Sequence, residues 1–211
     1  MSKELLLVGG GGHCHSCIDV IEQEARFTIA GVVEKPGEDL SGKIFDYPVL
    51  GTDDDLSVLR KDYSYALITI GQIKSAKLRM RLYEHLLELG FELPVIISPW
   101  SYVSPRAKIG QGTIVMHHAL VNACVKVGAN CIINSKSLVE HDTVIEDNCH
   151  IATGAVINGG SQVGKGSFVG SACNIKEGVT LDENCLLGMG TSLKKDIPKN
   201  TRINKSSNHE E

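Results

Sequence analysis

The chain has 211 residues, and 21 Lys and Arg against 25 Asp and Glu give a formal net charge of −4. This balance argues against binding to a phosphate backbone, so we expect no nucleic-acid partner. Hydrophobic residues make up 42% of the chain, which is enough to form a core. No run reaches the roughly 18 apolar residues of a membrane span, and the apolar start is too short for a signal peptide. We therefore expect a soluble, cytoplasmic protein with no membrane span.

The first hundred residues alternate between strand-like and helix-like segments. An apolar run at residues 4–8 predicts a buried strand, and the glycines after it lead into an amphipathic helix that carries Ile18 and Ile21. The remaining elements are expected, in chain order, as a strand at 29–33, a short helix at 53–59, a strand at 65–70 and a helix at 75–89. The predicted buried face of the last helix carries Leu78, Leu82, Leu86 and Leu89. The alternation predicts a small α/β, Rossmann-like domain at residues 1–98, with helices on the faces of a parallel sheet.

Four glycines at positions 9–12 separate the first predicted strand from the first predicted helix. They do not complete the dinucleotide-binding pattern G-x-G-x-x-G, because Cys14 stands at the third glycine position. Peptide N–H groups of such a turn attract anions at a helix N-terminus, so the turn is either a phosphate cradle or simply a tight connection. Glu34 follows the second predicted strand, where a carboxylate can bind a ribose hydroxyl.

Histidines and cysteines cluster directly after the glycine run, as His13, Cys14, His15 and Cys17. A single C-x-x-C pair without a second pair is weak support for zinc, so we expect structural thiols here. All seven cysteines of the chain are expected to be reduced, because we find no export signal.

A period of six residues organises the second half of the chain. Stepping by six from Val103 to Leu193 meets sixteen aliphatic residues in succession, and a second series four residues after each anchor is small or β-branched. Hexapeptide repeats of this kind form a parallel β-helix, in which three short strands make one coil of about 18 residues. We place this domain, with a polar C-terminal tail, at residues 99–211. Its inner series includes four cysteines that we expect to be buried core thiols, Cys131, Cys149, Cys173 and Cys185.

Coil arithmetic places a His–Asp pair next to a ledge without large side chains. With about 18 residues per coil, His141 and Asp142 lie above the small residues at 123–124 and below the glycines at 159–160. Such a ledge allows a ligand backbone or a thioester to approach. The alternative is that His141 is an exposed polar loop residue, and coil geometry alone does not separate the two interpretations.

A β-helical zinc hydratase is a competing hypothesis, because some enzymes of that type bind zinc through three histidines. His141 and His150 are nine residues apart, which is half a coil, and His150 lies above Ile132. Neither histidine stacks on another, so only contacts between chains would assemble such a site. We therefore expect no metal.

The segment from Asn134 to Gly160 resembles the signature of bacterial sugar O- and N-acyltransferases. This family includes sialic acid O-acetyltransferases and the N-acetyltransferases of nucleotide-linked bacillosamine and perosamine. The glycine turn with His13 is similar to the family's nucleotide-binding turn, and Ile70-Gly71 is similar to its later substrate-contacting glycine. The resemblance covers nearly the whole chain. It implies a left-handed β-helix, a homotrimer with active sites between adjacent subunits, and acetyl-CoA as the acetyl donor.

The same resemblance implies roles for individual residues. His141 is the general base and Asp142 orients it, since an amine that attacks a thioester must lose a proton to a neutral imidazole. A backbone N–H of the glycine ledge donates to the oxygen that becomes negative. The residues expected to bind acetyl-CoA are His150, Gly159, Gly160, Ser171 and Met189. The residues expected to bind the nucleotide-linked acceptor are Gly11, Gly12, His13, Glu34, Lys35, Gly71 and Asn134.

These observations lead to one main hypothesis and two alternatives. The main hypothesis is transfer of an acetyl group from acetyl-CoA to the amino group of a nucleotide-linked aminosugar used in a surface glycan. The alternative among enzymes is O-acetylation of a sialic-acid-like sugar. The alternative from another class is a non-catalytic β-helical trimer that acts as a binding or scaffold protein. That hypothesis does not require the open ledge beside His141.

Overall fold

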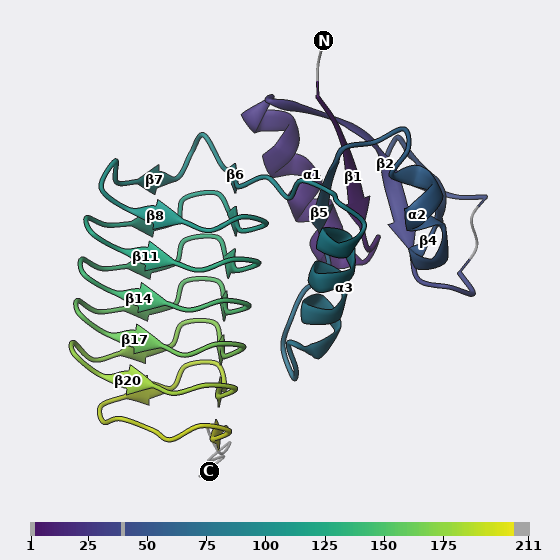
Figure 1. The fold of residues 1–211 in the computed structure, drawn as a ribbon. Helices are drawn as coiled ribbons and strands as arrows, with labels where there is room; N and C mark the ends of the chain where they lie inside the picture. The colour runs from purple at the N-terminus through teal and green to yellow at the C-terminus, as the bar shows by residue number, and fades with distance from the viewer. Residues whose placement is uncertain (1–2, 39–40, 205–211) are drawn as a thin grey trace, which may run out of the picture.

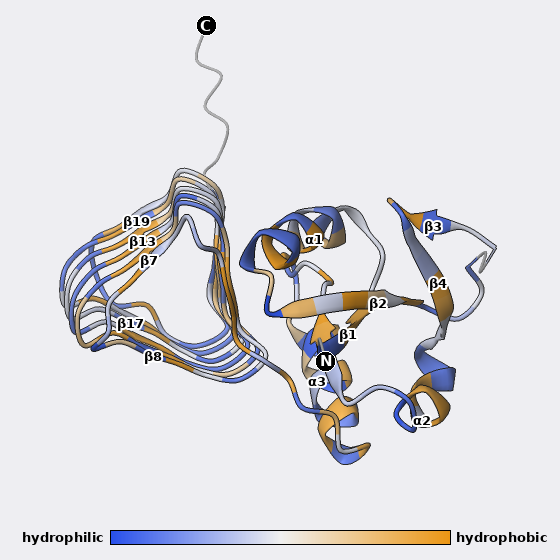
Figure 2. Cartoon of the chain, turned by 90° about the horizontal axis from the view of Figure 1, so that it is seen from above, coloured by the Kyte–Doolittle hydropathy of each residue, from blue (hydrophilic) through white to orange (hydrophobic). Residues whose placement is uncertain are grey.

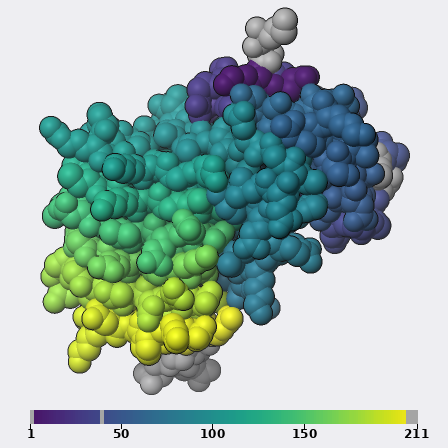
Figure 3. Space-filling model, in the orientation of Figure 1, coloured from purple at the N-terminus to yellow at the C-terminus, as the bar shows by residue number. Residues whose placement is uncertain are grey.

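The computed structural model describes residues 3–38 and 41–204. An α/β domain formed by the first part of the chain lies beside a triangular prism of short parallel strands (Figures 1 and 2). Side chains fill the space between the two ribbons (Figure 3). The polar tail assigned to the C-terminus falls largely at residues 205–211, outside the described part. Within that part, no helix has the length and apolar character needed to cross a bilayer.

The α/β domain is built on a five-stranded sheet of order β3-β4-β2-β1-β5, which is parallel except for the β3–β4 pair. Its elements are β1 (Lys3–Val8), α1 (Gly12–Glu24), β2 (Phe27–Glu34), β3 (Lys43–Ile44), β4 (Tyr47–Thr52), the 3-10 turn η1 (Asp53–Asp55), α2 (Leu56–Leu59), β5 (Tyr65–Ile68) and α3 (Lys77–Glu88). The predicted parallel sheet with flanking helices is confirmed.

Strand β1 is buried on both faces because helices cover both sides of the sheet. Leu5 and Leu7 pack in the same cluster as Ile18 of α1, whereas Leu6 and Val8 pack in the cluster that contains α3. Figure 2 shows α1 on one side of the strands and α2 and α3 on the other. A parallel strand covered in this way reads as a continuous apolar run, which is why the sequence predicts it.

The antiparallel pair of β3 and β4 is absent from the sequence-based prediction. Pro48 and Gly51 both lie within β4, and both residue types are depleted in strands because proline lacks an N–H and glycine has no side chain to pack. The strand forms because its neighbour β2 pairs with it in the sheet. Tertiary pairing therefore outweighs a weak local preference.

Helix α3 buries the predicted face except in its first turn, and Leu89 also packs against the core. Leu82 and Leu86 are buried as expected, but Leu78 is 44% exposed and the neighbouring Arg79 is only 1% exposed. The first turn of α3 lies against a turn of the second domain, where Asn130 accepts hydrogen bonds from Arg79. In the first turn of α3, the charged Arg79 is therefore buried in place of the predicted Leu78.

The second domain is a left-handed parallel β-helix of two-residue strands. Sheet 1 contains β6 (Ile96–Ile97), β9 (Ile114–Val115), β12 (Ile132–Ile133), β15 (His150–Ile151), β18 (Phe168–Val169), β21 (Leu186–Leu187) and β23 (Arg202–Ile203). Sheet 2 contains β7 (Tyr102–Val103), β10 (Leu120–Val121), β13 (Leu138–Val139), β16 (Val156–Ile157), β19 (Asn174–Ile175) and β22 (Ser192–Leu193). Sheet 3 contains β8 (Lys108–Ile109), β11 (Lys126–Val127), β14 (Val144–Ile145), β17 (Gln162–Val163) and β20 (Thr180–Leu181).

The register of these sheets follows the six-residue period. Each of the sixteen predicted anchors is the second residue of one strand from β7 to β22. Leu120 pairs with Leu138, and Leu138 pairs with Val156, so stacked strands are one coil apart. The anchors form one core inside the prism together with the four predicted inner cysteines, which are buried free thiols. Strand β6 already pairs with β9, so the β-helix begins slightly before the predicted boundary at residue 98.

The three outer faces of the prism differ in character. Sheet 1 is covered by the α/β domain, whose helix α1 packs in one cluster with Ile96, Ile114 and Ile132. The outer side chains of sheet 2 are apolar and partly exposed from β7 to β16, namely Tyr102, Leu120, Leu138 and Val156. At β19 and β22 they are polar and exposed, namely Asn174 and Ser192. Sheet 3 is mainly polar on its outer side, with Lys108, Lys126, Gln162 and Thr180.

Candidate active site

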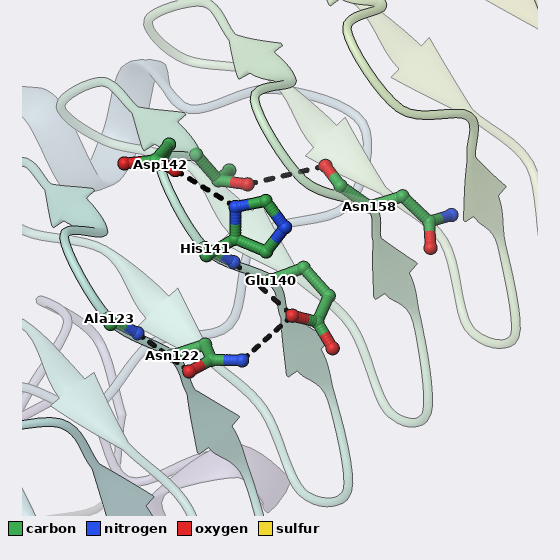
Figure 4. A network of polar contacts seen from close by, with 7 residues as sticks. Asn122, Ala123, Glu140, His141, Asp142 and Asn158 are labelled. Atoms are coloured by element: carbon green, nitrogen blue, oxygen red, sulfur yellow. Dashed lines mark hydrogen bonds and ion pairs between the residues drawn. The ribbon is translucent and has the colours of Figure 1, made fainter.

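His141 and Asp142 lie side by side in the turn between β13 and β14 (Figure 4). The Nδ1 atom of His141 lies 2.9 Å from Oδ2 of Asp142. Because a carboxylate only accepts, Nδ1 carries the proton in the neutral ring and Nε2 keeps its lone pair. Next to the pair, Glu140 Oε2 accepts a hydrogen bond from Asn122 Nδ2 at 2.8 Å. The side chains of His141 and Asp142 are 63% and 65% exposed in the single chain, so a substrate has access to them.

Backbone hydrogen bonds hold this turn from above and below. The N–H of Gly160 donates to His141 O at 2.9 Å, and the N–H of Asp142 donates to Ala123 O at 3.1 Å. The stacking expected from the coil arithmetic is thus confirmed for these positions. Asp142 has φ 58°, in the left-handed region that Asp and Asn tolerate better than most residues. The two functional groups are therefore placed by a rigid ladder and not by a mobile loop.

The two glycines of the expected ledge differ in what surrounds them. A Cβ atom added to Gly159 would lie 2.7 Å from His141 Nε2, so the imidazole faces this glycine directly. A Cβ atom on Gly160 would meet no heavy atom within 4 Å, although its φ of +68° disfavours any side chain. The N–H of Gly160 is used by His141 O, whereas the N–H of Gly159 has no acceptor among residues 3–38 and 41–204. Open space and a free amide thus occur side by side at His141.

A second candidate site lies where the glycine turn meets sheet 1. Gly11, Gly12 and His13 at the start of α1 line a pocket of about 380 Å³. The loop at 69–73, which includes Gly71, lines its other side, and His150 of the β-helix also contributes. The structure therefore gathers four of the predicted acceptor residues in a pocket that spans both domains.

His150 is 6% exposed and has a hydrogen-bond partner at each ring nitrogen. Nδ1 donates to the backbone oxygen of Gln72 at 2.6 Å, and Nε2 lies 3.2 Å from Nδ2 of Asn134. Burial lowers the pKa of His150 to about 4, with a further lowering from the charge of Arg79 and an opposing effect of the Gln72 bond. His150, predicted for the coenzyme, thus lies with the predicted acceptor residues of its own chain, and Asn134 adjoins it.

His13 faces the same pocket as a neutral imidazole. Its pKa is lowered to about 4, chiefly by burial and then by the charges of His150 and Arg79. The His13 and His150 ring centres are 6.3 Å apart. The Nε2 atom of His13 is buried and has no hydrogen-bond partner within the described part of the chain.

The other members of the His13 to Cys17 cluster point elsewhere. His15 is exposed and packs against Phe45, with ring centres 4.7 Å apart. Cys14 and Cys17 are buried in the core, and burial raises the pKa of both thiols. No group of three or more His, Cys, Asp or Glu that is able to hold a metal ion occurs among the residues that the structure describes.

The two residues after β2 occupy different environments. The carboxylate of Glu34 lies against Gly10, where an added Cβ would collide with it. The ammonium of Lys35 pairs with Glu38 at 2.9 Å and is largely exposed. Glu34 therefore adjoins the glycine turn, whereas Lys35 lies outside the pocket.

The residues predicted to bind the coenzyme are divided between two corners of the prism. Ser171 and Met189 follow β18 and β21 at the corner between sheets 1 and 2, and Met189 is 74% exposed. Gly159 and Gly160 lie at the corner between sheets 2 and 3, together with His141. In Figure 2 this second corner is on the far side of the prism from the α/β domain. A single chain therefore does not bring His141 to the pocket at the glycine turn.

Sequence reasoning misses several residues that build this pocket. Thr69 Oγ1 donates to Gly9 O at 2.6 Å, and Gln72 Nε2 donates to Asn148 O at 3.0 Å. The available signal is their position after β5, since the carboxyl edge of a parallel sheet is where such folds bind ligands. The sequence gives no such signal for Arg79, because an arginine within a predicted helix is expected to be exposed to solvent.

The chain matches three known protein families. The PglD N-terminal domain family matches residues 4–86, the bacterial transferase hexapeptide family (six repeats) matches residues 124–159, and the hexapeptide repeat of succinyl-transferase matches residues 162–195. A search among curated proteins gives no significant match.

Solved structures with the same architecture match almost the full chain. A variant of perosamine N-acetyltransferase from Caulobacter crescentus, in complex with CoA and GDP-perosamine, is 28% identical, with a TM-score of 0.90 over 97% of this chain and 95% of that one. The acetyltransferase domain of PglB from Neisseria gonorrhoeae, in complex with acetyl coenzyme A, is 27% identical, with a TM-score of 0.88 over 97% of each chain. WeeI from Acinetobacter baumannii, at 17% identity and a TM-score of 0.60, shares the fold over 97% of this chain and 98% of its own. Together with the matched domains, these similarities show that the chain belongs to the hexapeptide-repeat sugar acyltransferases.

Proposed function

We propose that this protein transfers an acetyl group from acetyl-CoA to the amino group of a nucleotide-linked aminosugar, as a step in the synthesis of a surface glycan. The observation that carries the proposal is the His141–Asp142 pair, whose imidazole faces Gly159. Structures that match nearly the whole chain hold CoA with GDP-perosamine, or acetyl coenzyme A. These complexes support both the donor and the class of acceptor.

His141 acts as the general base. Its Nδ1–H is held by Asp142, so the lone pair of Nε2 points at the ledge and accepts the proton that the attacking amine loses. The Asp142 carboxylate stabilises the imidazolium that forms and keeps the ring in one orientation. The proton gained by Nε2 is then available to the departing thiolate.

The backbone N–H of Gly159 stabilises the negative charge that develops during the reaction. The carbonyl oxygen under attack gains negative charge, and a backbone N–H that is already in place stabilises it without reorganisation. Gly160 cannot serve in this way, because its N–H is bound to His141 O. The lack of a side chain at Gly159 leaves room beside Nε2 for the reacting groups.

Acetyl-CoA fits this ledge, since the space above Gly160 is open and the Gly159 amide is without a partner among the described residues. The coenzyme supplies the acetyl thioester. We assign its binding to Gly159 and Gly160 of one chain and to Ser171 and Met189 of a neighbouring chain. His150 itself lines the acceptor pocket of its own chain.

A homotrimer accounts for the division of the site over two corners. The outer face of sheet 2 is apolar from β7 to β16, with Leu120, Leu138 and Val156 partly exposed, and packing against another copy removes this surface from water. In a threefold assembly built on sheet 2, the corner that carries His141 meets the opposite corner of the next chain. That chain brings Asn134 and its glycine-turn pocket close to the base.

The acceptor binds by its nucleotide at the α/β domain. Peptide N–H groups of Gly11 and Gly12 at the start of α1 suit a diphosphate. Glu34 beside the turn suits a ribose hydroxyl, as the position after the second strand predicts. Gly71 faces the turn across the pocket. His13 and Asn134 then contact the remainder of the acceptor.

Thiol release from acetyl-CoA tests the proposal. We expect release with UDP-, GDP- or CMP-linked aminosugars and no release with their N-acetylated forms. Release with sialic acids alone would assign the protein to O-acetylation instead. Absence of release with every acceptor, from a protein that is folded and trimeric, would favour a non-catalytic role. A His85→Ala protein, which lacks a half-buried histidine of α3 outside both candidate sites, is the matched control.

A further inference from the structure

Arg79 is a buried cation without an anionic partner. Its residue is 1% exposed, and none of the ion pairs among the described residues involves it. The guanidinium instead contacts only neutral groups, with thiols of Cys17 and Cys131 nearby. Burial raises the pKa of Cys17, so this neighbour is uncharged. Burying an unpaired charge costs folding free energy unless hydrogen bonds compensate for the lost hydration. The unpaired charge of Arg79 therefore points to a functional role.

The guanidinium joins the two domains through carbonyl oxygens. Nη1 donates to Ile68 O at 3.1 Å, at the end of β5, and to Ile70 O at 2.6 Å, in the loop that follows. Nη2 donates to Asn130 Oδ1 at 2.7 Å and to Asn130 O at 3.2 Å in the β-helix. Arg79 thereby fixes the start of the loop that lines the pocket at the glycine turn.

The shortest of these bonds reaches the peptide that faces the pocket. The carbonyl of Ile70 and the N–H of Gly71 belong to the same peptide group, and both residues line the pocket. The Gly71 N–H has no acceptor within residues 3–38 and 41–204. A Cβ added to Gly71 would lie 3.6 Å from His13 Cβ, so this glycine lies opposite the glycine turn. A carbonyl that accepts from a cation polarises its own peptide and makes the N–H a stronger donor.

We propose that Arg79 is a positioning residue that, through the Ile70–Gly71 peptide, prepares the Gly71 N–H to bind the diphosphate of the acceptor. The guanidinium itself does not touch the ligand, because it is buried behind the loop. The ligand class is a nucleoside diphosphate, so the proposal rests on the proposed function for its acceptor. The positive charge of Arg79 also gives the pocket an electrostatic potential that favours an anion.

The test compares ligands with and without a diphosphate by isothermal titration calorimetry. We expect Arg79→Met to bind GDP or UDP about tenfold more weakly than the wild type and to bind guanosine or uridine unchanged. In turnover, the KM for the acceptor should rise, while kcat at saturating acceptor and the KM for acetyl-CoA should stay within about twofold. Arg81→Met, on the exposed side of the same helix, is the matched control and should bind all ligands normally.

Further measurements keep the proposal falsifiable if Arg79→Met does not fold. Arg79→Lys keeps the charge but cannot reach both domains with its single ammonium, and it should show an intermediate loss. In the wild type, inorganic pyrophosphate should shift the Gly71 amide resonance downfield. Equal losses for nucleoside diphosphates and nucleosides, or an unmoved Gly71 amide, would overturn the proposal. Binding of pyrophosphate that depends on Arg79, without binding of any nucleoside diphosphate, would instead refute the nucleotide-linked acceptor and leave the anion site standing.

Discussion

The imidazole of His150 in the β-helix donates from Nδ1 to the backbone oxygen of Gln72 in the α/β domain across 2.6 Å. This bond joins the two domains through a side chain whose pKa burial lowers to about 4. His13, on the opposite side of the same pocket, has its pKa lowered to about 4 as well. Both histidines are therefore neutral in the folded protein at neutral pH, and the junction between the domains depends on that state.

Acid should weaken the folded protein through these two histidines. An unfolded histidine titrates near ~6.5, so below that pH the unfolded chain binds protons that His13 and His150 do not bind until about pH 4. Their full contribution to the free energy of unfolding is present above pH ~6.5. It is lost as the pH falls toward 4, by up to about 3 kcal/mol for each histidine. Urea unfolding between neutral and mildly acidic pH measures this loss. His85→Ala should retain it and His150→Gln should reduce it, whereas a wild-type stability independent of pH over this range would contradict the prediction.

Replacement of His141 by alanine should remove the base and leave the scaffold intact. We expect turnover to fall by roughly 10²- to 10⁴-fold, with an unchanged affinity for acetyl-CoA and an unchanged trimer mass. Steady-state kinetics at saturating substrates, on a protein with a wild-type circular dichroism spectrum, measure the effect. Near-normal turnover by His141→Ala would mean that another group takes the proton.

Asp142→Asn should reduce turnover less than His141→Ala does. Asparagine tolerates the φ of 58° at this position, so the turn is preserved, but the negative charge beside the imidazole is lost. The base then remains with a poorer orientation and a less stabilised charged form. The ratio of kcat for the two variants is the measurement, and a loss as deep as that of His141→Ala would assign Asp142 a larger role.

Gly159→Ala and Gly160→Ala should damage the protein in different ways. The new methyl at 159 would lie 2.7 Å from Nε2 of the base, so the imidazole must shift and turnover should fall by at least about tenfold. At 160 there is room, but the φ of +68° should cost about 1 kcal/mol of stability. Gly178→Ala is a matched control for that strain, since its φ is +69° and nothing lies within 4 Å of the added atom. Kinetics and thermal melting of the three proteins separate the effects, and normal turnover by Gly159→Ala would exclude close packing against the base.

The protein should have a mass in solution of about three times 22.7 kDa. Leu138→Glu places a charge on the apolar outer face of sheet 2 and should dissociate the trimer, with loss of activity. Gln162→Glu on the polar outer face of sheet 3 is the control and should leave the mass unchanged. Light scattering measures both. A stable wild-type monomer would refute the trimer and with it an active site between subunits.

The repeat was predictable because one residue type recurs at one spacing. The anchors from Val103 to Leu193 all fill the narrow prism, so each position reports the same physical constraint. The stacking of His141 beneath Gly159 followed from that register alone. The sequence also separated the two domains, because the spacing of apolar residues changes where the prolines interrupt the chain.

Residues that depend on contact between the domains were not predictable. Gln72 and Arg79 have no periodic partner, and their hydrogen bonds reach Asn148 and Asn130, more than fifty positions away. The burial of Arg79 is decided by a polar turn of the β-helix lying against α3. Local patterns describe the neighbours of a residue in the chain, and these contacts join segments that only the assembled domains bring together.

The fixed register of the prism has a consequence for how this chain can change in length. Inserting a single hexad between His141 and Gly159 would move every later strand to the next face, so the base would face a different turn. Insertion of a whole coil there would put new residues in the place of Gly159. A whole coil inserted between Val103 and Asn130 would leave the pair in contact, but it would move Asn130 and His150 away from Arg79 and Gln72. This fold therefore tolerates growth only in multiples of three repeats, placed away from both the reactive corner and the contacts between the domains.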